Sequence, residues 1–356
     1  MSAPRLEINL DKIRNNARTL VKRLSIHSIS VTGITKATLG SPEIANVLLE
    51  AGVSALGDSR AQNVERMRKA GVNAPITLIR SPMFSQIEQV VTHTDISFNT
   101  ELDIINALSN VAQKMNRTHG IVLMVELGDL REGIMPEDVE NIARKVCELP
   151  NLDFKGIGTN LACRSGVSPD AKNMGELSAL ASSIESSLGF KMDIVSGGNS
   201  GNLEWALNGA DTGRINNLRL GESILLGLNP LNRKPIEGLH IDAFKLYGEV
   251  IEAKVKPSQP WGEIAQTAFG TPPEIIKPIT NQGDISQVLL AIGEQDTDTG
   301  GLTPPPGIEI LSASSDHLIL NAGENCPSIG DEIAFQLNYS ALVRAMTSPF
   351  VHKKFS

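Results

Sequence analysis

Short apolar segments alternate with longer amphipathic segments from residue 28 to about residue 221. The short segments are rich in β-branched residues, which is typical of buried strands. The segments between them have apolar residues at helical spacing. Eight strands that alternate with helices predict a closed (β/α)8 barrel, and so many units in about 195 residues disfavour the alternative, an open doubly wound sheet. The predicted strands are Ser28–Lys36, Ala55–Ser59, Pro75–Ser81, Asp95–Asn99, Gly120–Leu127, Phe154–Asn160, Met192–Ser196 and Gly213–Leu220, and the predicted helices are Pro42–Ala51, Ala61–Ala70, Glu101–Lys114, Pro136–Glu148 and Asn173–Leu188.

The pattern changes after residue 235, where short strand-like segments are separated by turns rich in glycine and proline. Such spacing predicts a small β domain. We therefore expect a barrel over residues 1–234 and a C-terminal β domain over residues 235–356, joined by a linker at Asn229–Pro235. The predicted strands of the second domain are Ala243–Val255, Val288–Ile292, Ile308–Ala313, Leu318–Asn321 and Glu332–Leu337.

Polar side chains follow the predicted barrel strands at their carboxyl ends. Since the active sites of such barrels lie at that rim, the clustering predicts a functional site there. Lys36 ends the first strand; it is either an ordinary surface lysine or an amine desolvated by its surroundings, which would be a nucleophile or a base. The other residues of this rim are Asp58–Arg60, Arg80, Asn99, Asp129–Arg131, Thr159, Asn160, Ser196–Ser200 and Arg219–Glu222.

Composition limits the classes of partner. The 356 residues have a net charge of −8 and no basic stripe, and Trp and Tyr are few, which argues against a nucleic-acid surface. No apolar run approaches the length of a membrane span, and the N-terminus lacks the features of a signal peptide. The three cysteines are far apart, which fits a reducing compartment. We expect a soluble cytoplasmic protein that binds neither nucleic acid nor membrane.

Two loops at the rim suit a phosphate group. Ser196–Ser200 follows the seventh strand and Arg219–Glu222 closes the eighth, where barrels often bind phosphate. Glycines allow close approach of the backbone, and amides and hydroxyls can surround the anion. No nucleotide-binding glycine motif is present in the chain. A lysine opposite a phosphate site suits pyridoxal 5′-phosphate (PLP), whose aldehyde reacts with an amine.

These motifs together resemble the barrel-type PLP enzymes of the alanine racemase superfamily, and within them the group of ornithine racemases and related predicted amino-acid racemases. The resemblance covers essentially the whole chain. It implies a PLP-dependent isomerase that racemises a free amino acid, either ornithine or another basic one. The matching segments are Pro4–Ile13, Val31–Lys36, Leu127–Gly133, Gly156–Leu161, Ser196–Ser200, Asn216–Glu222, Ser314–Leu318 and Ala345–Pro349.

The resemblance also implies roles for individual residues. Lys36 would bind PLP through a Schiff base and act as the base on one face of the substrate. Arg131 would lie near the phenolic oxygen of the cofactor or the substrate carboxylate, and Arg219 would face the pyridine nitrogen. The remaining cofactor-binding residues would be Asn160 together with the two phosphate loops, which contribute Ser196, Gly197, Gly198, Ser200, Gly221 and Glu222.

The second base departs from the family pattern. In alanine racemases it is a tyrosine from the β domain of the other subunit, but the matching segment here, Gly262–Gly270, has none, and Tyr247 and Tyr339 are the chain's only tyrosines. His317 with Asp316 beside it is the best candidate, because imidazole titrates near neutral pH. Asp296 is a third candidate. A site completed by a second subunit requires a homodimer, which we expect to be head-to-tail.

Two questions stay open from the sequence. The ammonium group of a basic substrate needs a carboxylate, for which Asp58, Asp296 or Asp298 is available. The activity also has alternatives on the same scaffold: a D-threonine aldolase or D-serine dehydratase with a metal near His317 and Cys326, or a non-catalytic PLP carrier. Carriers of that kind end after the barrel, which argues against the carrier. We expect a racemase without a bound metal, and the metal-dependent enzymes stay the alternative.

Overall fold

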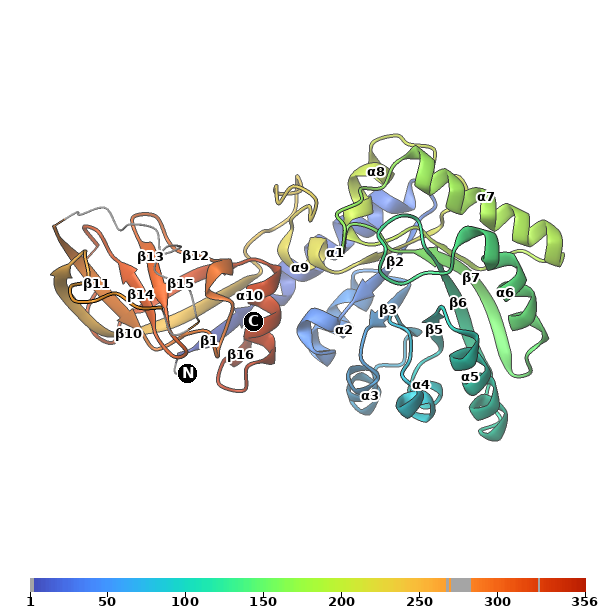
Figure 1. Cartoon of the computed structure of the whole chain (residues 1–356), viewed down its shortest axis with the longest axis horizontal. Helices are drawn as coiled ribbons and strands as arrows, with labels where there is room; N and C mark the ends of the chain where they lie inside the picture. The colour runs from blue at the N-terminus through green and yellow to red at the C-terminus, as the bar shows by residue number, and fades with distance from the viewer. Residues whose placement is uncertain (1–2, 267–268, 270–282, 326) are drawn as a thin grey trace. The chain divides into compact units, whose positions relative to one another are not determined.

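The computed structural model describes residues 3–266, 269, 283–325 and 327–356. Within it the chain forms two compact units (Figure 1). One unit is Leu10–Ile241, and the other combines Asp242–Ser356 with the N-terminal segment that ends at Asn9.

The first unit is a closed barrel of eight parallel strands in chain order. β9 pairs with β2 from Ser30↔Asn217 to Gly33↔Leu220, which closes the ring and rules out an open sheet. All eight strands predicted from the sequence are confirmed. Their bounds are β2 Ser30–Ile34, β3 Ala55–Asp58, β4 Ile76–Leu78, β5 Ile96–Asn99, β6 His119–Val125, β7 Leu152–Thr159, β8 Ile194–Ser196 and β9 Asn217–Leu220.

Helices alternate with these strands and confirm the five that the pattern predicts. Four more helices in this unit, α1, α4, α8 and α9, were not predicted. None of the helices in the described ranges is long and apolar enough to cross a membrane. Their bounds are α1 Leu10–Ser25, α2 Pro42–Glu50, α3 Ala61–Lys69, α4 Ile87–His93, α5 Leu102–Lys114, α6 Pro136–Glu148, α7 Ala171–Leu188, α8 Leu203–Leu207 and α9 Glu222–Leu226.

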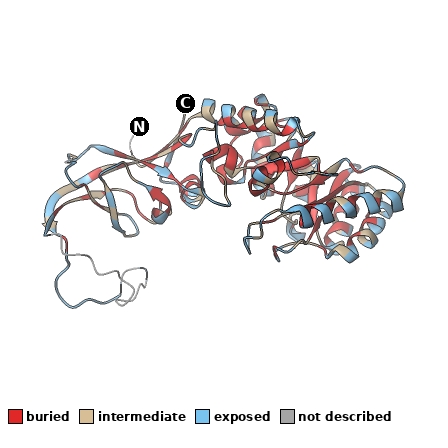
Figure 2. Ribbon diagram, turned by 90° about the horizontal axis from the view of Figure 1, so that it is seen from above, coloured by how far each residue is buried: buried red, intermediate tan, exposed pale blue. Residues whose placement is uncertain are grey.

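Two apolar clusters lie on the two faces of the barrel wall, and β6 contributes to both. Its Ile121, Leu123 and Val125 pack with the helices outside, while Val122 and Met124 pack against Phe98 of β5. This follows from the alternation of side chains along a strand. In Figure 2 the strands of the barrel are mostly buried, and the helices around them have one buried and one exposed face. Rigid strand ends therefore support the loops that form the rim.

The second unit is an antiparallel sheet with the order β12-β15-β10-β11-β14-β13, and β1 and β16 pair beside β10. The five strands predicted for this domain are confirmed; β1, β12, β16 and α10 were not predicted. Their bounds are β1 Arg5–Ile8, β10 Phe244–Pro257, β11 Asp284–Leu290, β12 Leu302–Thr303, β13 Glu309–Ala313, β14 Leu318–Asn321, β15 Glu332–Leu337, α10 Tyr339–Thr347 and β16 His352–Phe355.

The observed division of the chain differs from the expected one of 1–234 and 235–356. β1 belongs to the β unit because it pairs antiparallel with β10 and parallel with β16. The barrel unit starts only at Leu10 and continues to Ile241, past the expected linker. A short strand at the start of the chain has no local signal for a partner more than 200 residues away.

Candidate active site

The carboxyl ends of the barrel strands enclose a cavity of about 380 Å³. Four residues predicted to bind the cofactor line it: Lys36, Arg131, Asn160 and Arg219. Ser59, Ile79, Arg80, Ser81 and Glu132 complete the lining. The cavity thus has four cationic side chains and one carboxylate, which favours an anionic ligand.

Lys36 begins the short 3-10 turn η1 (Lys36–Thr38) directly after β2. Its side chain is exposed, yet it lies in a concave part of the surface where protein atoms surround the amine. Desolvation by these atoms lowers its pKa below the ordinary value; Cys163 opposes this shift, and Arg131 and Arg219 add to it. A lowered pKa makes the amine a better nucleophile at neutral pH.

Arg219 leaves β9 toward the barrel interior and is only 5 % exposed. Its Nη1 donates to Ser196 Oγ at 2.7 Å, and its Nη2 donates to the Thr159 carbonyl at 2.7 Å and to Asn160 Oδ1 at 3.3 Å. Burial lowers its pKa to about 10, so the guanidinium stays charged at neutral pH. These bonds fix its direction and make it a donor toward the cavity.

Arg131 lies in the loop after β6 and forms an ion pair with Glu132. Burial acts to lower its pKa, but the hydrogen bond and charge of Glu132 outweigh this effect and raise it. Glu132 is the neighbouring residue in a motif that the sequence singled out, yet its position in the cavity was not predicted.

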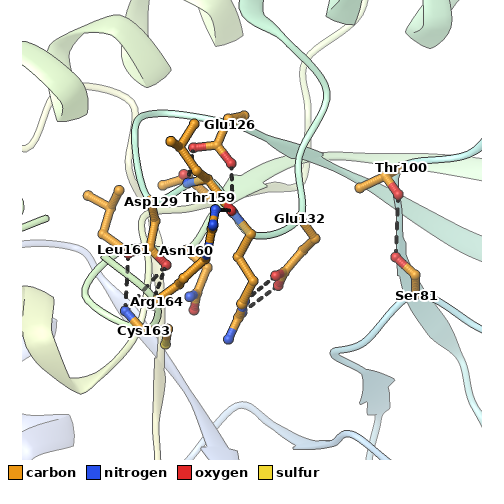
Figure 3. Close-up of polar contacts among 12 residues, drawn as sticks. Ser81, Thr100, Glu126, Asp129, Glu132, Thr159, Asn160, Leu161, Cys163 and Arg164 are labelled. Atoms are coloured by element: carbon orange, nitrogen blue, oxygen red, sulfur yellow. Dashed lines mark hydrogen bonds and ion pairs between the residues drawn. The ribbon is translucent and has the colours of Figure 1, made fainter. Parts of the chain in front are cut away.

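Two carboxylates fix the Arg131 loop (Figure 3). Glu126 accepts hydrogen bonds from the amides of Gly128 and Leu130 at 2.7 and 2.9 Å. Asp129 is 1 % exposed and accepts from the amides of Arg164 and Ser165, both at 3.0 Å. Asp129 therefore joins this loop to the one after β7, and both loops reach the rim as one connected structure.

The two predicted phosphate loops are also in contact. Ser200 Oγ accepts from the amides of Gly221 and Ser223 at 3.3 and 3.2 Å, and the Arg219 amide donates to the Gly198 carbonyl at 2.9 Å. Ser223, which the sequence did not indicate, is part of this arrangement. These residues do not line the cavity of Lys36; Ser196 connects to it through its bond with Arg219.

Glycine is required within the first of these loops. Gly198 has φ +139°, and a Cβ there would lie 2.1 Å from Oδ1 of Asn202. Next to it, a Cβ on Gly197 would lie 2.7 Å from Cγ2 of Ile215. Glycine at these two positions therefore lets the loop pack closely against Asn202 and Ile215.

Glu222 opens α9, and its side chain forms an ion pair with Arg233. Burial raises the pKa of this carboxyl, and Arg233 acts against that shift. Its carboxylate is therefore engaged within the protein, and only its main chain remains for the predicted phosphate contact.

Asp58 is not available for the ammonium group of a substrate, contrary to one expectation from the sequence. It is fully buried and accepts from Thr35 Oγ1 at 2.7 Å, Asn63 Nδ2 at 3.0 Å and the Arg60 amide at 2.9 Å. Burial raises its pKa. Since Thr35 immediately precedes Lys36, Asp58 instead fixes the turn that presents the lysine.

Asp58→Ala is expected to lower the free energy of unfolding by about 3 kcal/mol or more, because three buried donors lose their acceptor. Asp58→Asn keeps an oxygen for the Arg60 amide and Asn63, so its loss should be clearly smaller. Urea unfolding of both variants checks this. Equal losses would contradict the assigned role of the Asp58 oxygens.

The residues predicted for the second base lie in the β unit. Asp316 and His317 follow β13, and His317 Nδ1 lies 3.0 Å from Asp316 Oδ1. Hydrogen bonding to His317 lowers the pKa of Asp316. The pair predicted from the sequence is therefore present, and its catalytic role stays a prediction.

Asp296, the third candidate, is buried and accepts from the Gly293 amide at 3.0 Å. The ring centroid of Tyr247, one of the two tyrosines, lies 4.2 Å from the Arg5 guanidinium. Cys326 and part of Gly262–Gly270 lie outside the described residues. Within the described part of the chain, no three His, Cys, Asp or Glu side chains are grouped as metal ligands.

The family model "Alanine racemase, N-terminal domain" matches residues 8–230, more than half of the chain. The chain belongs to the alanine racemase family. Because the curated relatives that this family member matches over its full length are racemases, the chain is an amino-acid racemase, an isomerase.

Two relatives and one solved structure define the similarity. The racemase is 40 % identical to the lysine racemase of Thermotoga maritima over 100 % of this chain and 99 % of the relative. It is 37 % identical to the ornithine racemase of Acetoanaerobium sticklandii over 99 % of each chain. The alanine racemase of Bartonella henselae with covalently bound pyridoxal phosphate has the same fold, with a TM-score of 0.75 at 16 % identity over 100 % of both chains.

Proposed function

We propose that this racemase uses PLP, held by Lys36, to invert the Cα configuration of a free basic amino acid, lysine or ornithine. The observation that supports it most is a single cavity that brings the amine of Lys36 together with Arg219, Arg131 and Asn160. Its excess of cationic groups suits a phosphorylated cofactor and a substrate carboxylate.

The donor set of the site fits PLP. Lys36 has a lowered pKa, as a Schiff-base lysine requires. Nδ2 of Asn160 is buried without a hydrogen-bond partner among the described residues, although this residue lines the cavity. An unpaired donor in the cavity lining favours an anionic group with several acceptor oxygens.

The residues of the site have separate roles in the proposed reaction. When bound, PLP withdraws electrons from Cα and so acidifies its proton. Lys36 Nζ removes or returns that proton on one face. Arg219 stays protonated, and its Nη1 and Nη2 donate to Ser196 Oγ and to the Thr159 carbonyl. It therefore acts as a permanent hydrogen-bond donor and not as an acid. Asp58 and Thr35 hold the Lys36 turn in place.

Inversion needs a second proton donor on the opposite face, and we propose His317 for it. Its contact with Asp316 would orient the ring. We further propose that a second copy of the chain supplies this residue, so that the active enzyme is a homodimer. Mixing inactive Lys36→Ala and inactive His317→Ala chains should then restore part of the activity.

Preference for a basic substrate rests on the two full-length relatives, a lysine racemase and an ornithine racemase. Incubation of the purified protein with PLP and each L-amino acid in D2O tests it. Deuterium should enter Cα of lysine or ornithine while the D-enantiomer accumulates, and alanine should react at least tenfold more slowly. Exchange with none of the amino acids would refute the proposed function.

Chelation separates a racemase from a metal-dependent aldolase or dehydratase on the same scaffold. Treatment with EDTA followed by removal of the chelate is expected to leave the rate of racemisation unchanged. Loss of activity that Zn²⁺ or Mn²⁺ restores would contradict the proposed reaction.

A further inference from the structure

Arg80 is the cation of the cavity that the proposed function does not yet use. It follows β4 at its carboxyl end, and its side chain is partly buried in the cavity lining. Arg219 is bonded to Ser196 and Thr159, and Arg131 is paired with Glu132. The described residues offer no hydrogen bond or ion pair to Arg80, so all five of its N–H donors are open to a ligand.

The surroundings of Arg80 make an anion the missing partner. Burial lowers the pKa of Arg80, and the positive charge of Arg60 adds to this shift. No carboxylate of the described residues pairs with either guanidinium. Ser59 and Ser81, which follow β3 and β4, line the same wall of the cavity and offer hydroxyl groups. Like charges gathered on a concave surface are stabilised when a carboxylate binds between them.

The barrel order separates this wall from the phosphate loops. β4 is the third strand of the ring β2-β3-β4-β5-β6-β7-β8-β9, and β8 is the seventh, so their ends lie half the circumference apart. The loop Ser196–Ser200 begins at the end of β8. An anion at Arg80 is therefore distinct from a phosphate held by that loop. Lys36, after β2, lies between the two along the ring.

We propose that Arg80 binds the α-carboxylate of the amino-acid substrate and so determines how the substrate enters the cavity. This inference rests on the proposed function and adds to it the group that recognises the substrate. The reacting amino group lies near Lys36, two strands away in the ring, while the carboxylate lies against Ser59, Arg80 and Ser81. Arg131, whose Nε and Nη2 donate to Glu132, keeps Nη1 for the cofactor.

The direction of the substrate side chain follows from the position of the carboxylate at Arg80. A lysine or ornithine side chain ends in an ammonium group, which the cations of the cavity repel. With its carboxylate at Arg80, the substrate keeps this group away from the wall of β3 and β4. Arg80 thus discriminates against amines that lack a carboxylate, because these leave its charge unpaired in a partly desolvated place.

The test compares lysine with 1,5-diaminopentane, the diamine that remains when lysine loses its carboxylate. Both are titrated into the PLP-loaded protein, and binding is followed by the change in cofactor absorbance. In Arg80→Gln the affinity for lysine should fall about 10- to 100-fold, as expected for loss of a charged hydrogen bond. The affinity for the diamine and for PLP itself should change less than twofold.

Two further variants and a kinetic measurement serve as controls. Arg80→Lys should recover part of the affinity for lysine, and Arg18→Gln, on the exposed face of α1, should match the parent protein. In steady-state assays Arg80→Gln should raise KM more than it lowers kcat. A parallel fall in affinity for PLP, or an unchanged ratio of lysine to diamine affinity, would overturn the role of Arg80 alone. A parent protein that takes up no PLP would overturn both the proposed function and this inference.

Discussion

Lys36→Ala is expected to yield a folded protein that neither acquires visible absorbance with PLP nor exchanges the Cα proton of lysine. The variant removes both the amine that bonds to the cofactor and the base on one face of the substrate. Loss of a positioned acid or base alone costs about a thousandfold in rate, and loss of the covalent attachment adds to this. Absorbance spectra and proton exchange in D2O measure the two effects separately.

Lys36→Arg is the sharper control, because it keeps a cation in the cavity but cannot form a Schiff base. It should be as colourless as Lys36→Ala. Lys69→Ala removes a lysine whose side chain is 73 % exposed on α3, and it should behave as the parent protein. Colour and exchange that survive in both Lys36 variants would show that another amine holds the cofactor.

The same lysine affects the stability of the cofactor-free protein. The pKa of Lys36 is lowered in the folded state, so the unfolded chain binds the proton more tightly than the folded protein. The contribution of Lys36 to stability therefore falls as the pH drops below 10.5, the ordinary pKa of a lysine. Lys36→Met should therefore melt at a slightly higher temperature than the cofactor-free parent at pH 7. This advantage should disappear as the pH approaches 10.5. Thermal melts across pH measure it, and an advantage that grows with pH would contradict the desolvated amine.

Gly198→Ala is expected to have the second largest effect, a loss of PLP affinity of at least about tenfold together with a less stable barrel. The new Cβ would lie 2.1 Å from Oδ1 of Asn202, and φ is +139°, a conformation that alanine avoids. Asn202 has little freedom to move, because its Nδ2 donates to the Gly197 carbonyl at 2.8 Å and its Oδ1 accepts from the Asn199 amide at 3.2 Å. The loop must therefore distort.

Gly201→Ala provides the matched control three residues further along the loop. Its nearest neighbour would be Oδ1 of Asn199 at 3.2 Å, and its φ lies outside the strained range. Fluorescence titration with PLP and thermal melts of both variants measure the difference. Equal affinities for Gly198→Ala and the parent protein would show that this loop does not bind the phosphate.

The barrel is the part of the fold that the sequence predicts well, because short strands rich in apolar residues alternate with amphipathic helices. The termini are different. Arg5–Ile8 has an ordinary short pattern, and its partners Phe244–Pro257 and His352–Phe355 are far away in the sequence, so no local signal identifies this pairing. Helices α4, α8 and α9 are too short for a clear period.

In the site, motif and position together predicted Lys36, Arg131, Asn160 and Arg219, since the carboxyl ends of barrel strands converge. The role of a side chain there depends on its hydrogen-bond partners, and the sequence does not reveal which groups pair. The sequence offers Asp58 as a carboxylate for the substrate, but its oxygens accept hydrogen bonds from Thr35, Asn63 and the Arg60 amide. The sequence indicates Arg80 only as one of several polar residues at the rim. The structure adds that Arg131 and Arg219 are bonded to protein groups, whereas Arg80 has no such partner among the described residues.

The pairing of β1 with β10 and β16 has a consequence for synthesis on the ribosome. Residues 10–241 form the whole barrel unit and are inserted, in chain order, between the first strand of the β unit and the rest of it. β1 therefore emerges before the barrel and waits for its partners until the barrel has been translated, because β10 and β16 follow the barrel in the chain. The barrel can fold as the chain emerges, whereas the β unit is completed only after β16 has been made. Until then β1 is an unpaired strand edge that chaperones would be expected to shield.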